Sequence, residues 1–327
     1  ATKFALMRLG DDYQPPAEEK LSGKESLVEQ WILHKLTNYS KTVNEALDKR
    51  DFLNSTSAIY EFWYLICDIY IENSKYLINE GSEVEKKSAR DTLYILLDNA
   101  LKMIHPFMPF ISEEMWQHLP KRVSEVSPSI VKASYPVYKA EFDNERAATD
   151  YEFVLDVTKE ARSLLAQYSI LKNGKVFIET NNDSLFKTAA SQKDSVVSLI
   201  KAIDEVTVVR SASDVPEGAV LQAVTPEVNV HVLVKGHVDI DAEISKTQKK
   251  LEKAQKSKQG IEKIINSKDY EAKANEQAKE SNKIKLENTA AEIEGLEATI
   301  ANLERLKLWA SYHFSHKIKL SWRFFLL

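Results

Sequence analysis

Apolar residues between positions 25 and 119 recur at steps of three and four, the period of amphipathic helices. This pattern predicts four helices, over residues 25–47, 54–70, 82–104 and 109–119. Ser22 and Glu25 have the spacing of a capping box for the first helix. Pro106 should end the third, because its ring removes a backbone donor. Four such helices with short links predict a helical bundle.

Between residues 140 and 238 the pattern changes to β-branched runs of strand length that alternate with helical stretches. The expected helices are 151–168 and 184–203, and the expected strands are 176–180, 206–209, 220–224 and 228–234. This arrangement predicts a small α/β domain. The three final strands need a sheet in which to pair, so we expect them together.

Residues 240–308 contain no proline, almost no aromatic residue and many charges. Ile244, Leu251 and Ile265 belong to a series at alternating steps of three and four, which is the seam of a coiled coil. Each arm is too short and too polar to be stable alone. The polar break at 266–269 would let the second arm fold back, so the sequence predicts an antiparallel coiled-coil hairpin.

The first arm of this hairpin is rich in lysine. One acidic residue, Glu252, stands among six lysines between positions 246 and 258. The candidates for contact with a phosphate backbone are Lys246, Lys249, Lys250, Lys253 and Lys256. The alternative is a solvated coiled-coil face that the acidic second arm balances.

The fold class is therefore mainly α, with a bundle, a small α/β domain and a helical hairpin. The predicted division is 1–24 (the end of a preceding helix and a linker), 25–139 (bundle), 140–238 (α/β domain), 239–308 (arm) and 309–327 (tail). The tail holds six aromatic and three basic residues without a helical period. We expect this tail to be a foreign or frame-shifted sequence that does not belong to the preceding domains.

Composition narrows the classes of function. The single cysteine, Cys67, excludes an internal disulfide and suits a reducing compartment, so we expect a cytoplasmic protein with a mitochondrial pool as the alternative. There is no run of 18 apolar residues for a membrane span. The seven histidines form no metal-ligand pattern, and no glycine-rich phosphate loop occurs. We therefore expect no catalytic residue, metal or cofactor in this chain.

One motif carries a resemblance to a known family. The run 105–117 resembles the signature that closes the anticodon-binding bundle of class I aminoacyl-tRNA synthetases for valine, isoleucine and leucine. Its characteristic residues are His105, Pro106, Phe107, Pro109, Phe110, Glu113, Glu114 and Trp116. We expect Phe107, Phe110, Met115 and Trp116 to be wedges in the core and the motif to hold the bundle together without touching RNA.

Two further matches point to the valyl enzymes of eukaryotic, fungal type. Residues 62–75 are similar to their second bundle helix, and 266–275 resemble the tip of their terminal arm. Asn275 departs from the proline that is usual there. The isoleucyl and leucyl enzymes end differently.

The resemblance implies an enzyme that joins valine to its tRNA with ATP and Mg²⁺ through a valyl-adenylate. The catalytic signatures His-x-Gly-His and Lys-Met-Ser-Lys-Ser are absent from this sequence. We therefore expect a truncated, catalytically silent tRNA-binding piece. Its expected partners are valine tRNA and the missing catalytic and editing domains, and we expect it to be a monomer.

Reading of the anticodon should fall to the bundle, where unstacked bases can meet aromatic and polar side chains. The candidates are Trp31, Lys35, Asn38, Tyr39, Asp68, Glu72 and Lys75. The last three share one helix face, which is also the pattern of a solvated face with i,i+4 pairing. Trp31 and Tyr39 also fit the apolar stripe and would then be core residues.

Two alternatives stay open. A helical bundle with a coiled-coil arm could be a protein-interaction adaptor without any enzymatic context, in which case its arm should dimerise through a continuous seam. The chain could also be the equivalent part of an isoleucyl or leucyl synthetase.

Overall fold

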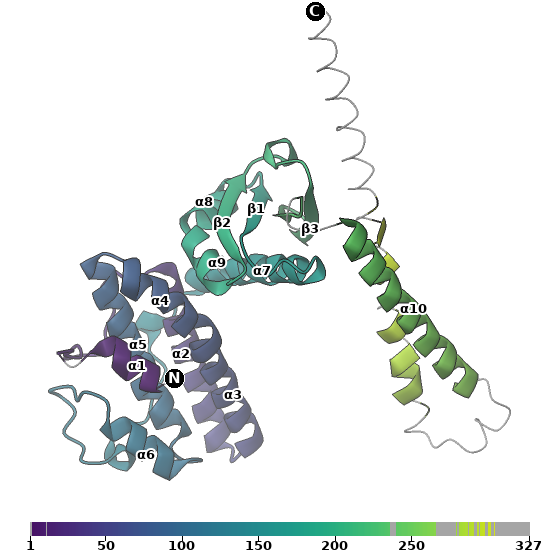
Figure 1. The fold of residues 1–327 in the computed structure, drawn as a ribbon. Coiled ribbons are helices and arrows are strands. Elements are labelled where there is room, and N and C mark those ends of the chain that lie inside the picture. The colour runs from purple at the N-terminus through teal and green to yellow at the C-terminus, as the bar shows by residue number, and fades with distance from the viewer. Residues whose placement is uncertain are drawn as a thin grey trace, which may run out of the picture.

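The computed structural model describes residues 2–10, 12–235 and 240–265, with single residues and short helical stretches between 279 and 304. It is mainly helical, with one four-stranded sheet (Figure 1). The helices that build the bundle are α1 (Thr2–Leu9), α2 (Leu27–Asp48), α3 (Phe52–Tyr64), α4 (Ile71–Glu80), α5 (Glu83–Ile104) and α6 (Pro109–Gln117). The four predicted bundle helices are therefore confirmed.

Helix α2 begins one turn later than the capping motif predicted. The capping box consists of Ser26 and Glu29, and the Ser26 backbone N–H donates to the Glu29 carboxylate at 2.6 Å. Ser22 and Glu25 make a similar contact at 2.8 Å, but they lie in the preceding linker. The two motifs are four residues apart, and the helix starts at the one whose glutamate is buried.

The predicted helix 54–70 extends further than expected and changes its winding. A π-helical segment, η1 (Leu65–Tyr70), joins α3 to α4. π-Helical turns are rare, and they often occur at functional sites. A period of three to four residues in the sequence does not distinguish such a segment from ordinary α-helix.

The signature run 105–117 forms the corner between α5 and α6. Trp116 is buried, and its Nε1 donates to Asp98 at 2.8 Å. Glu113 accepts hydrogen bonds from Ser129 Oγ at 2.8 Å and from the Ile130 N–H at 2.9 Å. Further polar contacts of the motif include His105 Nδ1 with Ser112 Oγ at 2.7 Å and Glu114 with His118 at 3.1 Å.

The expectation that Phe110 is a core wedge is wrong. Its side chain is 89% exposed, because it occupies the solvent face of the first turn of α6, directly after Pro109. Phe107 and Met115 are half-buried against the core, and Trp116 is the fully buried one of the four expected wedges.

The α/β domain contains α7 (Glu145–Gln167), α8 (Asp183–Ser191) and α9 (Lys193–Leu199). Its strands are β1 (Gly174–Thr180), β2 (Ile203–Val209), β3 (Ala219–Thr225) and β4 (Val228–Leu233), in the order β2-β1-β4-β3. The three final strands lie in one sheet, as expected, but β1 separates β2 from β4. Strands β1 and β2 are parallel, and α8 and α9 form the crossover that parallel pairing needs.

Helix α7 belongs to both parts of the fold. Near its start Tyr151 packs on Trp31 of α2, with 4.9 Å between the ring centroids. Near its end Leu165 lies against Gly174 at the start of β1, where an added Cβ would clash with Leu165 and with the Ala202 carbonyl. The buried apolar residues consequently form one continuous core.

A buried polar cluster reinforces this junction. Asn73 of α4 donates to the Tyr151 hydroxyl at 2.9 Å and to Ser195 of α9, and Tyr151 and Ser195 are 3.1 Å apart. All three side chains are buried. Buried polar groups are costly unless they are hydrogen-bonded, so the cluster favours one relative position of α4, α7 and α9.

The arm begins with α10 (Ile240–Ile265), which confirms the first predicted arm as a helix (Figure 1). The predicted turn at 266–269, the tip 266–275 and the tail 309–327 lie outside the described residues. The hairpin therefore stays a prediction. Within the described part of the chain, no helix has the length and apolarity of a membrane span.

We expect Asn73→Ala to lower the free energy of unfolding by about 1–3 kcal/mol, because Tyr151 and Ser195 lose a buried partner. Chemical denaturation followed by circular dichroism measures this change. The matched control is Asn79→Ala on the same helix, where the side chain is exposed and bonds to Arg8. That variant should change stability by about 0.5 kcal/mol or less. Equal effects of the two substitutions would contradict a structural role for the cluster.

Candidate nucleic-acid interface

The candidate Trp31 lies in the core. It is 1% exposed and packs on Tyr151, so its ring has no free face for a base. Tyr39 is half-buried, and its hydroxyl donates to Glu61 at 3.1 Å. Burial, helped by this bond, raises the pKa of Tyr39 to about 12. Both residues therefore belong to the apolar stripe that packs against the core, which was the alternative to a role in stacking on bases.

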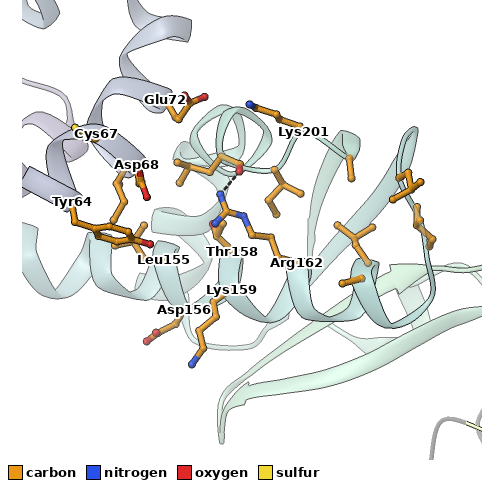
Figure 2. Close-up of a pocket in the computed structure, with 18 residues that line it drawn as sticks. Tyr64, Cys67, Asp68, Glu72, Leu155, Asp156, Thr158, Lys159, Arg162 and Lys201 are labelled. Atoms are coloured by element: carbon orange, nitrogen blue, oxygen red, sulfur yellow. Dashed lines mark hydrogen bonds between the residues drawn. The ribbon is translucent and has the colours of Figure 1, made fainter. Parts of the chain in front are cut away.

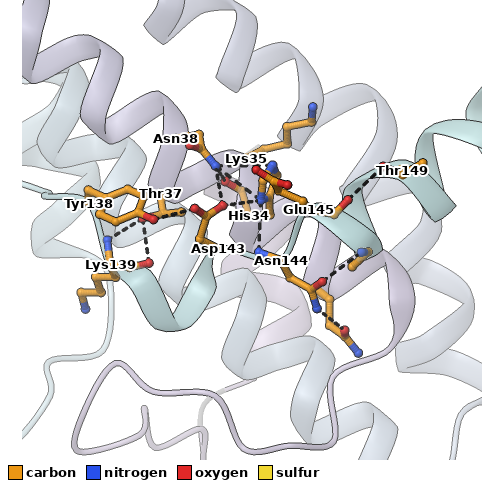
Figure 3. Close-up of polar contacts among 12 residues, drawn as sticks. His34, Lys35, Thr37, Asn38, Tyr138, Lys139, Asp143, Asn144, Glu145 and Thr149 are labelled. Carbon is orange, nitrogen blue, oxygen red and sulfur yellow. Dashed lines mark hydrogen bonds and ion pairs between the residues drawn. The ribbon is translucent and has the colours of Figure 1, made fainter.

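Lys35 and Asn38 hold the start of α7 against α2 (Figure 3). The Lys35 ammonium is 2.5 Å from Glu152, and Asn38 Nδ2 donates to Asp143 at 3.1 Å. Tyr138 also donates to Asp143, at 2.5 Å, and the bonds from Tyr138 and Asn38 lower the pKa of the Asp143 carboxyl. These contacts give both candidates a structural role at the junction.

The remaining three candidates lie along η1 and α4. Lys75 pairs with Glu72 at 2.6 Å, and its ammonium is 5.7 Å from the centroid of the Phe4 ring. Asp68 is exposed and forms no hydrogen bond or ion pair with any residue that the structure describes. Of the carboxylates among the bundle candidates, Asp68 is thus the one whose side chain has no partner in the described part of the chain.

Asp68 and Glu72 line a groove of about 920 Å³ between the bundle and the α/β domain (Figure 2). One wall is η1 with the ends of α3 and α4. The other wall is α7 with the segment 199–202, and these contribute the apolar side chains of Leu155, Leu165 and Ile200. A groove of this size, with an apolar lining and several polar groups, is typical of a small-ligand site.

Tyr64, Arg162 and Lys201 of this groove were not among the predicted candidates. Tyr64 precedes Asp68 by one turn and is 54% exposed, so the helical spacing that singled out Asp68 could also have found it. Arg162 and Lys201 come from α7 and from the turn before β2. They share the groove with Asp68 only because of the tertiary fold, and no local sequence pattern predicts this.

Several lysines of α10 are exposed. Lys249, Lys250, Lys253 and Lys256 form no ion pair with any residue in the described ranges, whereas Lys258 lies 4.0 Å from Glu262. Lys246 lies on the same helix, and its side chain is outside the described residues.

Among the described residues, no group of three or more histidine, cysteine or carboxylate side chains is placed to hold a metal ion. The groove and α10 offer a tyrosine ring, an unpaired carboxylate and basic groups, which are chemical features suited to nucleic-acid binding.

Comparisons with known proteins bear on this interpretation. Residues 29–180 match the model of the anticodon-binding domain of tRNA ligase. The match runs from α2 through α7 to the end of β1. The match therefore includes the groove residues from Tyr64 to Leu171, but not those of the segment 199–202. It identifies the anticodon-binding part of such enzymes rather than the catalytic domain.

The similar proteins are valine–tRNA ligases. The chain is 78% identical over 308 residues to the mitochondrial valine–tRNA ligase of Saccharomyces cerevisiae, covering 94% of this chain and 28% of that protein. It is 44% identical over 215 residues to the valine–tRNA ligase of Schizosaccharomyces pombe, and the match covers 65% of this chain and 22% of that protein. It is 32% identical over 309 residues to the mouse valine–tRNA ligase, and the match covers 94% of this chain and 24% of that protein.

The chain thus spans about a quarter of the length of these curated relatives. The matches favour the valine family over the adaptor and over the isoleucyl and leucyl alternatives. The chain belongs to the valine–tRNA ligase family of aminoacyl-tRNA synthetases, and it contains that family's anticodon-binding domain.

Proposed function

We propose that this chain binds valine tRNA and positions it for ATP-dependent valylation. The observation that carries the proposal is the anticodon-binding match over residues 29–180 together with high identity to valine–tRNA ligases. The reaction itself, with ATP and Mg²⁺, belongs to the catalytic domain of such enzymes. The proposed partners are valine tRNA and the enzyme's catalytic and editing domains.

The bundle and the arm have different tasks in this proposal. Asp68 and Glu72 read bases of the anticodon loop, since carboxylates accept hydrogen bonds from base edges. The lysines of α10 contact the phosphate backbone, which contributes affinity but no sequence information. Contacts far from the reacting groups can place the acceptor end of the tRNA in an active site.

The arm folds as an antiparallel hairpin in this proposal, and the chain acts as a monomer. Thr247 and Ala254 support it, because both are buried and lie seven residues apart on one face of α10. That is the heptad spacing of a coiled-coil seam. A helix covering this seam leaves the lysine-bearing faces open to RNA.

The net charge of −5 is compatible with this proposal because phosphates respond to local charge. For the cellular location we propose the cytoplasm with a mitochondrial pool. The relatives include one named mitochondrial and others named without that qualifier.

Replacement of Lys246, Lys250 and Lys253 with Gln should weaken binding of valine tRNA and of other tRNAs alike. The slope of log affinity against log salt should shrink by about 0.7 to 0.9 for each phosphate contact that is lost. Fluorescence titrations at several salt concentrations measure both quantities. The matched control is Lys175→Gln, whose ammonium pairs with Glu205 at 3.0 Å on the sheet and should have no effect on binding. Unchanged affinity and slope in the triple variant would show that the arm is only a solvated coiled coil.

Replacement of Asp68 with Asn and Glu72 with Gln should reduce the preference for a valine anticodon. The expected loss of discrimination is about 1–3 kcal/mol, while the salt slope stays nearly constant. The measurement compares the affinities for valine tRNA and for the same tRNA with a changed anticodon. The control is Glu83→Gln at the start of α5, an exposed carboxylate paired with Lys86. If the double variant discriminates as the unmodified chain does, these carboxylates do not read the anticodon.

A further inference from the structure

The groove between the bundle and the α/β domain is lined by acidic and basic side chains (Figure 2). Asp68 and Glu72 come from η1 and α4, and Arg162 and Lys201 come from α7 and the segment before β2. Helix α7 also contributes Asp156 and Lys159, and the remaining lining is largely apolar. A ligand that fits this arrangement has hydrogen-bond donors at one end, a negative charge at the other, and an apolar body.

The acidic wall offers an acceptor without a competing donor. Asp68 projects from η1 towards α7 (Figure 2), and it has no hydrogen-bond or ion-pair partner in the described part of the chain. An ionised carboxylate is acceptor-only. It therefore favours a base edge that carries an exocyclic amino group over one that carries a keto oxygen.

A stacking surface lies beside this acceptor. Tyr64 is one helical turn before Asp68, and its ring is next to Leu155 of α7 at the same end of the groove (Figure 2). Tyr64 is 54% exposed, so part of its ring is accessible. Unstacked RNA bases are commonly held on such faces. A base on Tyr64 could direct its edge to Asp68.

The opposite wall suits a phosphate. Arg162 extends into the middle of the groove, and one of its guanidinium nitrogens donates to the Leu199 carbonyl (Figure 2). This contact orients the guanidinium and uses one of its five donors. Lys201 has no hydrogen-bond or ion-pair partner among the residues in the described ranges. Arginine and lysine together are the usual ligands of phosphate oxygens.

We propose that the groove holds one everted nucleotide of the anticodon loop. Its base stacks on Tyr64, its exocyclic amino group donates to Asp68, and its phosphate faces Arg162 and Lys201. This inference rests on the proposed function and adds to it: it names the base class, and it gives the α/β domain half of the base-binding site. A nucleotide combines a planar amino-bearing ring with a negative charge, which a hydrophobic peptide segment does not.

The junction explains why both walls are needed at a fixed spacing. The groove spans α7, which carries Arg162 and also contacts α2 through Tyr151. The Asn73–Tyr151–Ser195 cluster ties α4, which carries Glu72, to α9, which leads to Lys201. The site is therefore preorganised, and little ordering of the protein opposes binding.

The test uses the full chain and stem-loop RNAs with the loop sequence of a valine tRNA. At each loop position, cytosine is exchanged for uracil or adenine for hypoxanthine, so that an amino group becomes a keto group. At one position the affinity of the unmodified chain for the amino base should exceed that for the keto base by about tenfold. This ratio corresponds to the lower half of the free energy that one base contact contributes to discrimination. Asp68→Asn adds a donor at the same place, and it should abolish or invert that preference.

The other two contacts have distinct signatures. Tyr64→Ala should weaken binding by about tenfold for either base, and Tyr64→Phe should restore it, because the ring rather than the hydroxyl provides stacking. Arg162→Gln with Lys201→Gln should weaken binding of both bases equally. It should also reduce the salt slope by about 0.7 per phosphate contact on a single strand.

Two control variants match these changes. Glu80→Gln alters an exposed carboxylate at the end of α4 that does not line the groove, and Tyr60→Ala removes an exposed tyrosine one turn before Tyr64. Both should bind as the unmodified chain does. Thermal denaturation checks that every variant is folded, which is expected because Asp68 and Tyr64 are exposed.

Two results would overturn the inference, and they differ in whether the proposed function survives. If the unmodified chain discriminates between loops but Asp68→Asn keeps that preference and Tyr64→Ala keeps the affinity, the groove is not the base site and the proposed function survives. If the unmodified chain does not distinguish any loop exchange, anticodon reading by this chain fails, and the base site fails with it.

Discussion

The arrangement of this molecule depends on the buried contact between Tyr151 of α7 and the bundle. The ring packs on Trp31, and the hydroxyl meets Asn73 and Ser195 at 2.9 and 3.1 Å. A tyrosine hydroxyl without partners would be costly at this depth, so the contact selects one orientation of α7. The same helix underlies the sheet. The groove thus has two walls of fixed spacing although they come from different parts of the chain.

This geometry separates two kinds of RNA contact. The groove offers a tyrosine face and a carboxylate, which distinguish bases but contribute modest affinity. The exposed lysines of α10 offer charge without geometric selection, which contributes affinity that falls with salt. An acidic chain can therefore bind a polyanion, because Lys249, Lys250 and Lys253 act over a few ångströms while the remaining charges are screened.

Local patterns predicted the helices well because amphipathic spacing records which face is buried. They could not predict the π-helix η1, whose apolar residues fit an α-helical period equally well, or the exposure of Phe110, which depends on where α6 begins. The insertion of β1 between β2 and β4 is a property of long-range pairing. In the site, Asp68 was predictable from its helix face, whereas Arg162 and Lys201 approach it through the tertiary fold alone.

The central claim is that α7 makes the bundle and the sheet one cooperative unit. Native-state hydrogen exchange of the full chain tests it, because segments that open together share one free energy of opening. Amides of α7 near Ala148 and near Leu165 should show the same opening free energy and the same dependence on denaturant. If the amides near Leu165 and those of β1 exchanged through a separate opening of lower free energy, while those near Ala148 stayed protected, the two parts would be independent and the groove would have no fixed shape.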